Sequence, residues 1–308
     1  MNDFANLLEN LLLTSSKKKK VELLTTYFQK SENKDKGWAL VLLTNGIKKR
    51  YLNTKDIKEL IIERVGDTLF KYSYDYVGDL AETISLLWKQ KFDDKQNIKL
   101  FEFLEYLSKK TNKSLLKEKL KNILDNSPEK LRFCFLKIIT GGFRVGVSNG
   151  LIKEALVNYG SRQLAEIEEL WHGFKPPYED FFKWLDGKDL PVYINKKYLF
   201  NTFMLANNFK IEDFVNKKTK DFFSEFKWDG IRAQLIISKK GRIFSRNGED
   251  ITYSFPDINV DHDSNYFVLD GEIVVKKNDK VLSFNDLQKR IGRKSPSNKL
   301  LNDFPAHF

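Results

Sequence analysis

The stretch that decides how this chain is organised reads Glu225-Phe226-Lys227-Trp228-Asp229-Gly230-Ile231-Arg232. Ala233, Leu235 and Ile237 follow it at alternate positions, which predicts that a β-strand begins where this octet ends. A lysine between two carboxylates, with a glycine and an arginine nearby, suits a nucleophile that attacks phosphorus. An amine attacks only when unprotonated, and ordinary lysine has a pKa of about 10.4. We therefore expect a buried setting or nearby cations to favour the neutral amine of Lys227.

The alternative interpretation of the octet is a surface turn without a functional role. Lys227, Asp229 and Gly230 alone would fit such a turn equally well, because the chain is rich in lysine. The complete octet is much rarer by chance, and it lies between Phe222-Phe223 and the predicted strand. Gly230 allows the backbone to approach a ligand closely or to adopt positive φ. The position favours a functional site at the edge of a sheet.

A second polar segment, Ser245-Arg246-Asn247-Gly248-Glu249-Asp250, comes after a hairpin predicted at Lys239-Lys240-Gly241. Asn247-Gly248 is a strong turn signal, so this segment alone predicts only the polar end of a hairpin. Its place after the octet and the predicted hairpin favours a functional role for this segment.

A third segment, Val268-Leu269-Asp270-Gly271-Glu272-Ile273-Val274, reads as an apolar strand with a tight kink at Asp270-Gly271. A hairpin or bulge with an exposed glutamate is the alternative. Glu272 has apolar neighbours, and a carboxylate in such a place needs a partner. We therefore assign Glu272 to the site.

Downstream, the family resemblance stated below implies a helix over residues 287–293. Leu287 and Ile291, four residues apart, would pack against the domain. Lys289, Arg290 and Arg293 would form a basic face on the other side.

These segments, in this order, resemble the motifs of ATP-dependent DNA ligases. The octet is similar to their nucleotidyl-lysine motif, in the variant with tryptophan before the aspartate. The resemblance implies that Lys227 attacks the α-phosphate of ATP and releases pyrophosphate. AMP then passes to the 5′-phosphate of a nick in duplex DNA, and the 3′-hydroxyl displaces it to seal the strand.

The resemblance also implies a role for each site residue. Glu225 would face the adenine, and Arg232 would contact the ribose or a phosphate. Arg246 would bind a phosphate of the nucleotide or of the nick. Asp229 would organise the nick or hold Mg²⁺, and Glu272 would bind the ribose hydroxyl or the same metal. The implied cofactors are ATP and Mg²⁺.

The first two hundred residues predict helix after helix. Phe101, Leu104 and Leu107 follow the helical period, as do several later leucines. Ser127-Pro128-Glu129 predicts a helix start, with the serine as cap and the proline in the first turn. No strand with period-two alternation is predicted before residue 198. Residues 38–50 and 74–83 resemble segments of the ligases' helical DNA-binding domain.

A glycine-rich segment, residues 140–150, resembles the turn by which that domain presents backbone amides to DNA. Glycines let a chain approach the minor groove, where exposed amides and an arginine can meet phosphates. Glycines that merely connect two helices are the alternative. Residues 17–20, four lysines in a row, predict a solvated helix face with only an incidental electrostatic role. The residues assigned to DNA contact are Gly141, Gly142, Arg144, Gly146 and Asn149.

Composition agrees with a protein that binds a phosphate backbone. The net charge is +11, and residues 1–200 hold 35 Lys and Arg against 27 Asp and Glu. One cysteine, Cys134, and three histidines exclude a zinc site and a disulfide framework, which fits a reducing cytoplasm. No uninterrupted apolar span of membrane length occurs. The expected partner is nicked duplex DNA, bound by a monomer.

The predicted fold class is multidomain α+β. An all-α DNA-binding domain would occupy residues 1–190, and the first, antiparallel-β-rich part of an adenylation (nucleotidyltransferase) domain would occupy residues 191–308. The ligases' later strands and OB domain have no counterpart, so we expect a C-terminally truncated enzyme, inactive or partly active alone. Two alternatives stay open: a fragment that only binds DNA, and a related RNA ligase or capping nucleotidyltransferase. The long helical domain argues against the second, because those enzymes lack it.

Overall fold

The computed structural model divides the chain into two compact units. A helical unit contains Met1–Ile167 and Phe174–Pro191, and a β unit contains Glu168–Gly173 and Val192–Phe308. Each unit is described by itself. The residues that the structure describes are 1–44, 47, 50–91, 98–109, 112–141, 143, 145–204, 206, 210, 212, 218–223, 225–263, 266–293 and 295–308.

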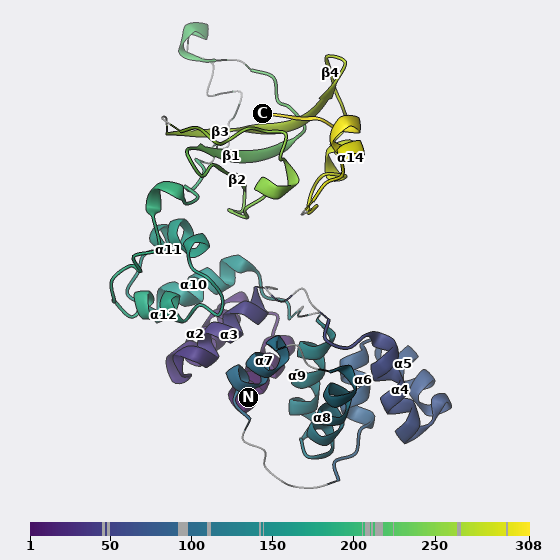
Figure 1. Ribbon diagram of the computed structural model, residues 1–308. Coiled ribbons are helices and arrows are strands. Elements are labelled where there is room, and N and C mark those ends of the chain that lie inside the picture. The colour runs from purple at the N-terminus through teal and green to yellow at the C-terminus, as the bar shows by residue number, and fades with distance from the viewer. Residues whose placement is uncertain are drawn as a thin grey trace. The chain divides into compact units, whose positions relative to one another are not determined.

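The helical unit is built from α-helices that pack side against side (Figure 1). Their bounds are α1 (Asn2–Leu13), α2 (Lys17–Lys30), α3 (Asn33–Leu43), α4 (Thr54–Val65), α5 (Asp67–Val77), α6 (Leu80–Leu87), α7 (Leu100–Ser108), α8 (Lys113–Asp125), α9 (Glu129–Thr140), α10 (Asn149–Tyr159), α11 (Leu164–Leu170, which continues into the β unit) and α12 (Glu179–Leu185). In the described part of the chain no strand precedes residue 231, which confirms the predicted all-α character.

Helix starts in this unit are set by short polar side chains that accept backbone N–H groups. Asn53 caps α4 and Asp79 caps α6, each by accepting the N–H three residues later. The predicted start at Ser127 is wrong by one position: Pro128 occupies the cap of α9 and makes no side-chain bond. Ser127 is buried instead, and its carbonyl accepts from the Arg132 guanidinium at 2.9 Å.

The core of the helical unit consists of apolar side chains from nearly every helix. α2 packs against α10, α6 against α9, and α3 against both α7 and α12. Phe103 and Phe135 meet edge to face with ring centroids 4.7 Å apart. Such close aromatic packing makes the faces of these helices hard to alter without a cost in stability.

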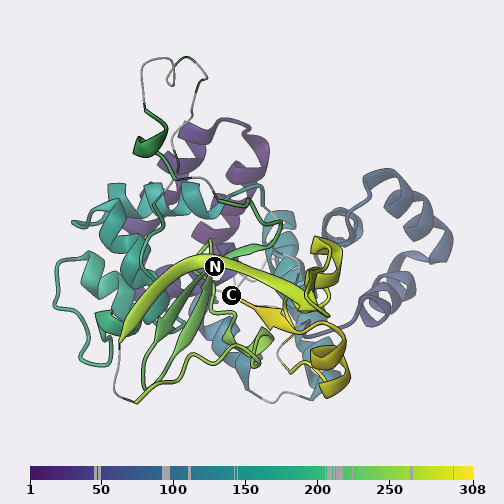
Figure 2. The same cartoon turned by 90° about the horizontal axis from the view of Figure 1, so that it is seen from above.

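The β unit contains one antiparallel sheet with short helices beside it. Its elements are η1 (Trp171–Gly173), η2 (Lys196–Tyr198), η4 (Thr219–Asp221), β1 (Ile231–Ile237), β2 (Arg242–Ser245), η5 (Thr252–Ser254), β3 (Phe267–Lys277), β4 (Lys280–Val281), α13 (Phe284–Gln288), α14 (Asn298–Asp303) and β5 (Ala306–His307). The strand order is β2-β1-β3-β4, and β5 also pairs with β3 (Figure 2). The helical unit and this antiparallel sheet together confirm the predicted fold class.

β1 and β2 form the hairpin predicted around Lys239-Lys240-Gly241. β1 begins at Ile231, directly after Gly230, as its alternating pattern predicts. Ala233 and Leu235, two positions apart in β1, are buried in the core beneath the sheet together with Ile273 of β3. The C-terminal end of the octet is therefore part of a strand that is paired within the sheet.

β3 corrects one prediction. Asp270 and Gly271 form no kink or hairpin: the strand runs through them, and Gly271 pairs in register with Ala233 of β1. The glycine has a different use, because a Cβ atom built on Gly271 would lie 2.5 Å from the Phe308 ring. Close packing against this ring, and not a turn, is therefore the local feature of Gly271.

Residues 287–293 also differ from their prediction. α13 ends at Gln288, Ile291 is exposed, and Arg290 is completely buried instead of lying on a basic face. The Arg290 guanidinium forms an ion pair with Asp257 and donates to the carbonyls of Ser254 and Phe304. Asp257 in turn accepts the Ala306 N–H at 2.7 Å. Arg290 thereby joins η5, α13 and the segment that leads into β5.

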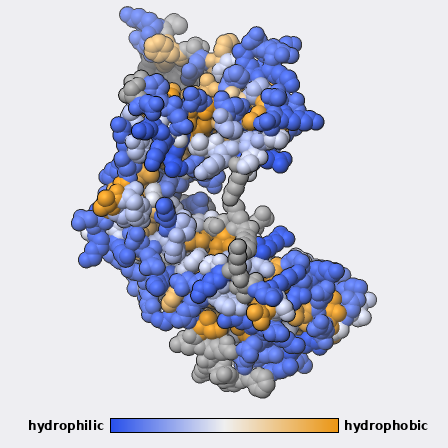
Figure 3. All heavy atoms as spheres, viewed as in Figure 1, coloured by the Kyte–Doolittle hydropathy of each residue, from blue (hydrophilic) through white to orange (hydrophobic). Residues whose placement is uncertain are grey.

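Polar surface covers most of the face shown in Figure 3, with scattered apolar patches. No described helix is long and apolar enough to cross a membrane. Cys134, the single cysteine, is buried in the core of the helical unit, and burial raises its pKa to about 12. A thiol in this state packs like a small apolar side chain.

Candidate functional site

The octet forms an exposed loop followed by the first residues of β1. Residues 225–228 have neither helix nor strand, and the Lys227 side chain is exposed. Phe226 and Trp228, on either side of it, contact each other with ring centroids 5.5 Å apart. The buried setting considered for Lys227 is therefore not found. A neutral amine here would need the other predicted influence, nearby cations.

Gly230 holds the end of this loop against β3. A Cβ atom at position 230 would lie 2.3 Å from the carbonyl oxygen of Ile273 and 2.8 Å from Cγ of Glu272. Only glycine allows this approach. The Gly230 backbone thus lies directly against the Glu272 side chain, and its N–H favours the charged form of that carboxyl.

The pKa of the Glu272 carboxyl is influenced by several residues of the octet. Burial raises the pKa of its carboxyl above the ordinary value. The Gly230 N–H and the positive charges of Lys227 and Arg232 oppose that rise, whereas Asp229 adds to it. Electrostatic coupling of this kind requires that these groups lie near one another. The strand register places Arg232 beside Glu272, and Gly230 packs against Glu272. Lys227 and Asp229 come immediately before this contact in the chain.

Arg232 is held in a defined position by β3 and by the segment before the octet. Its Nε and Nη2 donate to both carboxylate oxygens of Asp270, at 3.0 and 2.7 Å. Nη2 also donates to the Met204 carbonyl at 2.8 Å, and the guanidinium lies 4.6 Å from the centroid of the Phe203 ring. The hydrogen bonds to Asp270 raise the pKa of Arg232. The two N–H groups of Nη1 take no part in these bonds, so Arg232 can bind a ligand while it stays anchored.

Two predicted residues are not joined to this cluster by any contact among the described residues. Glu225 is exposed in the loop. Arg246 is exposed in a tight turn that closes on itself, because the Gly248 N–H donates to the Ser245 carbonyl at 2.8 Å. Gly248 has positive φ, and a Cβ there would collide with His172. The turn interpretation of this segment is therefore realised, and the phosphate contact of Arg246 stays a prediction.

A metal at the cluster would be bound by Asp229 and Glu272. Among the described residues no group of three or more His, Cys, Asp or Glu side chains could hold a metal by itself. Two carboxylates still fit Mg²⁺, which commonly binds one or two carboxylates and completes its shell with water and substrate phosphates. The raised pKa of Glu272 fits the same role, since a cation would offset the burial and repulsion that cause it.

The glycine-rich turn of the helical unit is anchored from within. Phe143 and Val145 are buried, and the Phe143 ring stacks on Phe4 at 5.8 Å. Gly141 and Gly146 have positive φ, and Gly142 and Arg144 lie outside the described residues. These anchors fix the chain on its way into α10.

After the turn, exposed polar groups begin α10. Ser148 caps the helix by accepting the Leu151 N–H, and Asn149 and Gly150 are exposed in its first turn. Lys20 donates to the Gly146 carbonyl at 2.7 Å. A helix N-terminus with free N–H groups and a lysine beside it attracts phosphates.

The sequence did not predict a role for two residues that contact the candidate sites, Lys20 and Asp270. Lys20 belongs to the lysine run assigned to a solvated face, yet α2 packs on α10 and brings it to the turn. Asp270 was treated only as part of a kink. The opposite charges of Asp270 and Arg232 were the available signal, but the β1–β3 register, which places them diagonally across the two strands, cannot be read from the sequence.

Comparison with known proteins covers both units. Residues 1–157 match the family model "DNA ligase N terminus", and residues 203–308 match "ATP dependent DNA ligase domain". A probable DNA ligase of Koribacter versatilis is 32% identical over 187 residues, 56% of this chain and 30% of that protein. A DNA ligase of Thermoplasma volcanium is 28% identical over 59% of this chain and 33% of that protein.

One relative aligns along nearly the whole chain. DNA ligase 1 of Korarchaeum cryptofilum is 23% identical over 99% of this chain, which corresponds to 59% of its own length. With the first two relatives, the matched stretch spans about a third of the length of the curated protein. The two family matches are collinear with the helical unit and the β unit.

Proposed function

Because the chain belongs to the ATP-dependent DNA ligases, we propose that Lys227 is its adenylated nucleophile. Nζ of Lys227 loses a proton and forms a bond to the α-phosphorus of ATP, and the bond from that phosphorus to the bridging oxygen breaks to release pyrophosphate. An oxygen of a 5′-phosphate at a nick then displaces the lysine, which recovers its amine. The 3′-hydroxyl finally attacks this phosphate, seals the strand and releases AMP.

The contact of the octet with Glu272, made by Gly230 and by the register that pairs Arg232 with Glu272, is the single observation that carries this proposal. These residues come from two segments separated by about forty positions, and only the pairing of β1 with β3 brings them together. A surface turn would leave the lysine without such neighbours. The cluster instead supplies a nucleophile, an anchored cation and two carboxylates at one edge of a sheet.

Within this cluster each residue has a task. The free Nη1 of Arg232 binds the ribose or a phosphate, and Arg246 binds a phosphate from its turn. Glu272 and Asp229 would hold Mg²⁺, which would supply charge neutralisation at the phosphates. Glu225 reads the adenine edge.

We also propose that the helical unit binds nicked duplex DNA as a monomer. The exposed start of α10 and Lys20 would contact phosphates, and the contact requires no base-specific group. The single buried cysteine fits our proposal that the protein acts in the cytoplasm. A Lys20→Gln variant should bind a nicked duplex about threefold more weakly and show a shallower dependence on salt. Lys17→Gln, at the exposed start of the same helix, is the matched control.

The catalytic proposal is tested by nucleotide-dependent labelling. The polypeptide that the gene encodes in full is incubated with Mg²⁺ and α-labelled ATP or GTP, or NAD labelled in its AMP moiety. We expect acid-labile label from ATP alone, and none in Lys227→Ala. Lys220→Ala, an exposed lysine upstream, should label as the wild type does. Label from GTP would indicate a capping-type nucleotidyltransferase, and full labelling of Lys227→Ala would refute the assignment.

A protein that only binds DNA is the second candidate function. It predicts binding of nicked duplex with no label from any of the three nucleotides. The match of residues 203–308 to the ATP dependent DNA ligase domain and the contact of the octet with Glu272 favour the catalytic candidate.

A further inference from the structure

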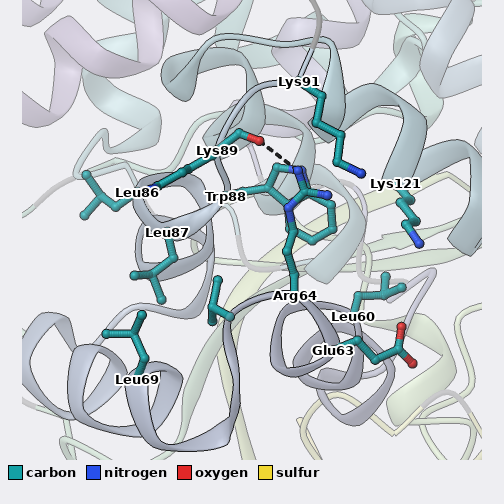
Figure 4. Close-up of a pocket in the computed structure, with 11 residues that line it drawn as sticks. Leu60, Glu63, Arg64, Leu69, Leu86, Leu87, Trp88, Lys89, Lys91 and Lys121 are labelled. Carbon is teal, nitrogen blue, oxygen red and sulfur yellow. Dashed lines mark hydrogen bonds between the residues drawn. The ribbon is translucent and has the colours of Figure 1, made fainter.

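The helical unit contains a groove that the proposed ligation chemistry does not use. Its volume is about 730 Å³, a size typical of pockets that bind ligands or side chains. The walls come from α4, α5, α6, α8 and the residues that follow α6 (Figure 4). We call it the leucine–lysine groove, after the side chains that line its two sides.

The base of the groove is rigid. The guanidinium of Arg64 lies 4.5 Å from the centroid of the Trp88 ring and pairs with Asp125 at 2.8 Å. Arg64 also donates to the Lys89 carbonyl at 2.9 Å, and the Trp88 indole N–H donates to Asp125 at 3.0 Å. Trp88 is fully buried. The groove is therefore formed before any ligand arrives, which lowers the entropic cost of binding.

The two sides of the groove differ in chemistry. Figure 4 shows Leu69, Leu86 and Leu87 gathered on one side of the Arg64–Trp88 stack, and Lys91 and Lys121 on the other. Leu69 and Leu86 are 52% and 51% exposed, which is unusual for two neighbouring leucines.

The charge of the groove is positive. Lysines 89, 91 and 121 line it, and Glu63 is the only acidic side chain among its lining residues. Asp125, which is nearby, is already engaged by Arg64 and Trp88. Within the described part of the chain, neither Lys89 nor Lys121 has an ion-pair partner among the contacts found. Two cations next to exposed leucines remain available to a ligand that is both anionic and apolar.

We propose that the leucine–lysine groove docks an acidic, amphipathic segment of a partner protein. Aliphatic or aromatic side chains of that segment would fill the leucine side, and its carboxylates would lie on Lys89 and Lys121. Charge complementarity selects an acidic partner, and the leucine wall selects an apolar one. A DNA backbone satisfies only the first requirement, since its sugars and phosphates gain nothing from a concave wall of leucines.

The adjoining face of α5 is suited to extend this contact. Tyr72 and Tyr76 follow Leu69 at helical spacing and are 74% and 92% exposed. Tyr74, between them, is engaged differently: it stacks on Phe70, and Lys58 lies 4.6 Å from its ring. Tyrosine is enriched at protein interfaces. A bound segment could thus run from the groove along α5.

The test selects peptides without assuming a partner. A phage-displayed library of random 12-residue peptides is panned on the whole chain, and enriched peptides are synthesised with a fluorescent label for anisotropy titrations. We expect enriched sequences to combine Asp or Glu with Leu, Ile, Phe or Trp. Their affinity should fall about tenfold or more in Leu69→Ser/Leu86→Ser and in Lys89→Glu/Lys121→Glu.

A charge-matched control separates specific docking from general attraction. Lys17→Glu/Lys18→Glu changes the net charge equally at a distant exposed site and should leave peptide affinity unchanged. If this control weakens binding as much as Lys89→Glu/Lys121→Glu does, or if enriched peptides lack acidic residues, the proposal is wrong. The four replaced groove residues are exposed, and circular dichroism verifies that each variant folds.

A nucleic-acid arm completes the experiment. Each variant is titrated with a labelled nicked duplex. If Lys89→Glu/Lys121→Glu lowers duplex affinity about tenfold while the selected peptides bind it as well as wild type, the groove is a DNA surface and the proposal is overturned. Loss of peptide binding in both groove variants, with the control intact, supports it.

Discussion

The glycine-rich turn of the helical unit and the octet of the β unit are both candidate ligand contacts, yet they are built differently. Phe143 and Val145 are buried, which anchors these two residues of the turn before α10 begins. The octet is exposed from residue 225 to residue 229, and only its last part is anchored. Gly230 lies against β3, and Arg232 is bonded to Asp270.

The difference follows from what each region is proposed to do. A surface that recognises the backbone of DNA needs amides and cations in fixed places. Buried side chains within the loop can hold such groups in place. A lysine that attacks a phosphate must reach its substrate and then pass the product on. Its anchoring therefore lies at one end of the loop, next to the carboxylate of Glu272.

The largest expected effect concerns the scaffold of the β unit. Arg290→Met would leave Asp257 and two carbonyls without their buried partner. We expect the free energy of unfolding to fall by about 3–5 kcal/mol, as is typical when one partner of a buried ion pair is removed. Chemical denaturation should show the loss in the transition of the β unit and not in that of the helical unit. Lys289→Met removes an exposed charge next to it and should have little effect. Equal stability of Arg290→Met and wild type would contradict the assigned role.

A smaller effect is expected from the same substitution made in both regions. Gly230→Ala places a methyl group against the Ile273 carbonyl, so the loop must shift, and adenylation should slow by about tenfold or more. Gly150→Ala in the first turn of α10 meets only Ser148 Oγ at an ordinary 3.7 Å and should stabilise the helical unit by about 0.5–1 kcal/mol. Similar behaviour of the two variants would remove the contrast between the regions.

The sequence predicted the local elements of both regions but not the contacts between distant residues. Helices, the β1–β2 hairpin and the strand after the octet depend on neighbours within a few residues, and their patterns were sufficient. The partners of Arg290 and Arg232 lie 33 and 38 positions away. Only the paired strands and the packed turns bring them into contact. Arginine is usually exposed to solvent, so the composition of residues 287–293 predicted an exposed basic face and not the buried Arg290.

A still smaller change should follow from loosening Arg232. Asp270→Asn keeps one acceptor but loses the charged, bidentate pair, which at a half-exposed site corresponds to about 1 kcal/mol. We expect the KM for ATP to rise about fivefold with little change in kcat, because binding and not bond formation depends on this arginine. Asp303→Asn, at an exposed pair with Lys277, is the control. A fall in kcat with unchanged KM would assign Asp270 to the chemical step instead.

The smallest expected effect is the pH dependence caused by Glu272. Because its pKa is raised on folding, the protonated form is favoured, and the stabilisation this gives is present below the ordinary pKa and lost as the pH rises through the folded pKa. Glu272→Gln should therefore raise the thermal midpoint of the β unit slightly at pH 7 and not at pH 4. Glu249→Gln, exposed in the neighbouring turn, should show no such difference. A variant less stable than wild type at pH 7 would contradict this sign.

The most direct test of the central claim locates the nucleotide on the chain. The full-length gene product is incubated with ATP and Mg²⁺, digested, and analysed by mass spectrometry under conditions that preserve phosphoramidate bonds. We predict one AMP on the peptide that contains Lys227 and none on peptides that contain Lys220 or Lys239. AMP attached to a different lysine, or a wild-type protein that carries none, would contradict the account.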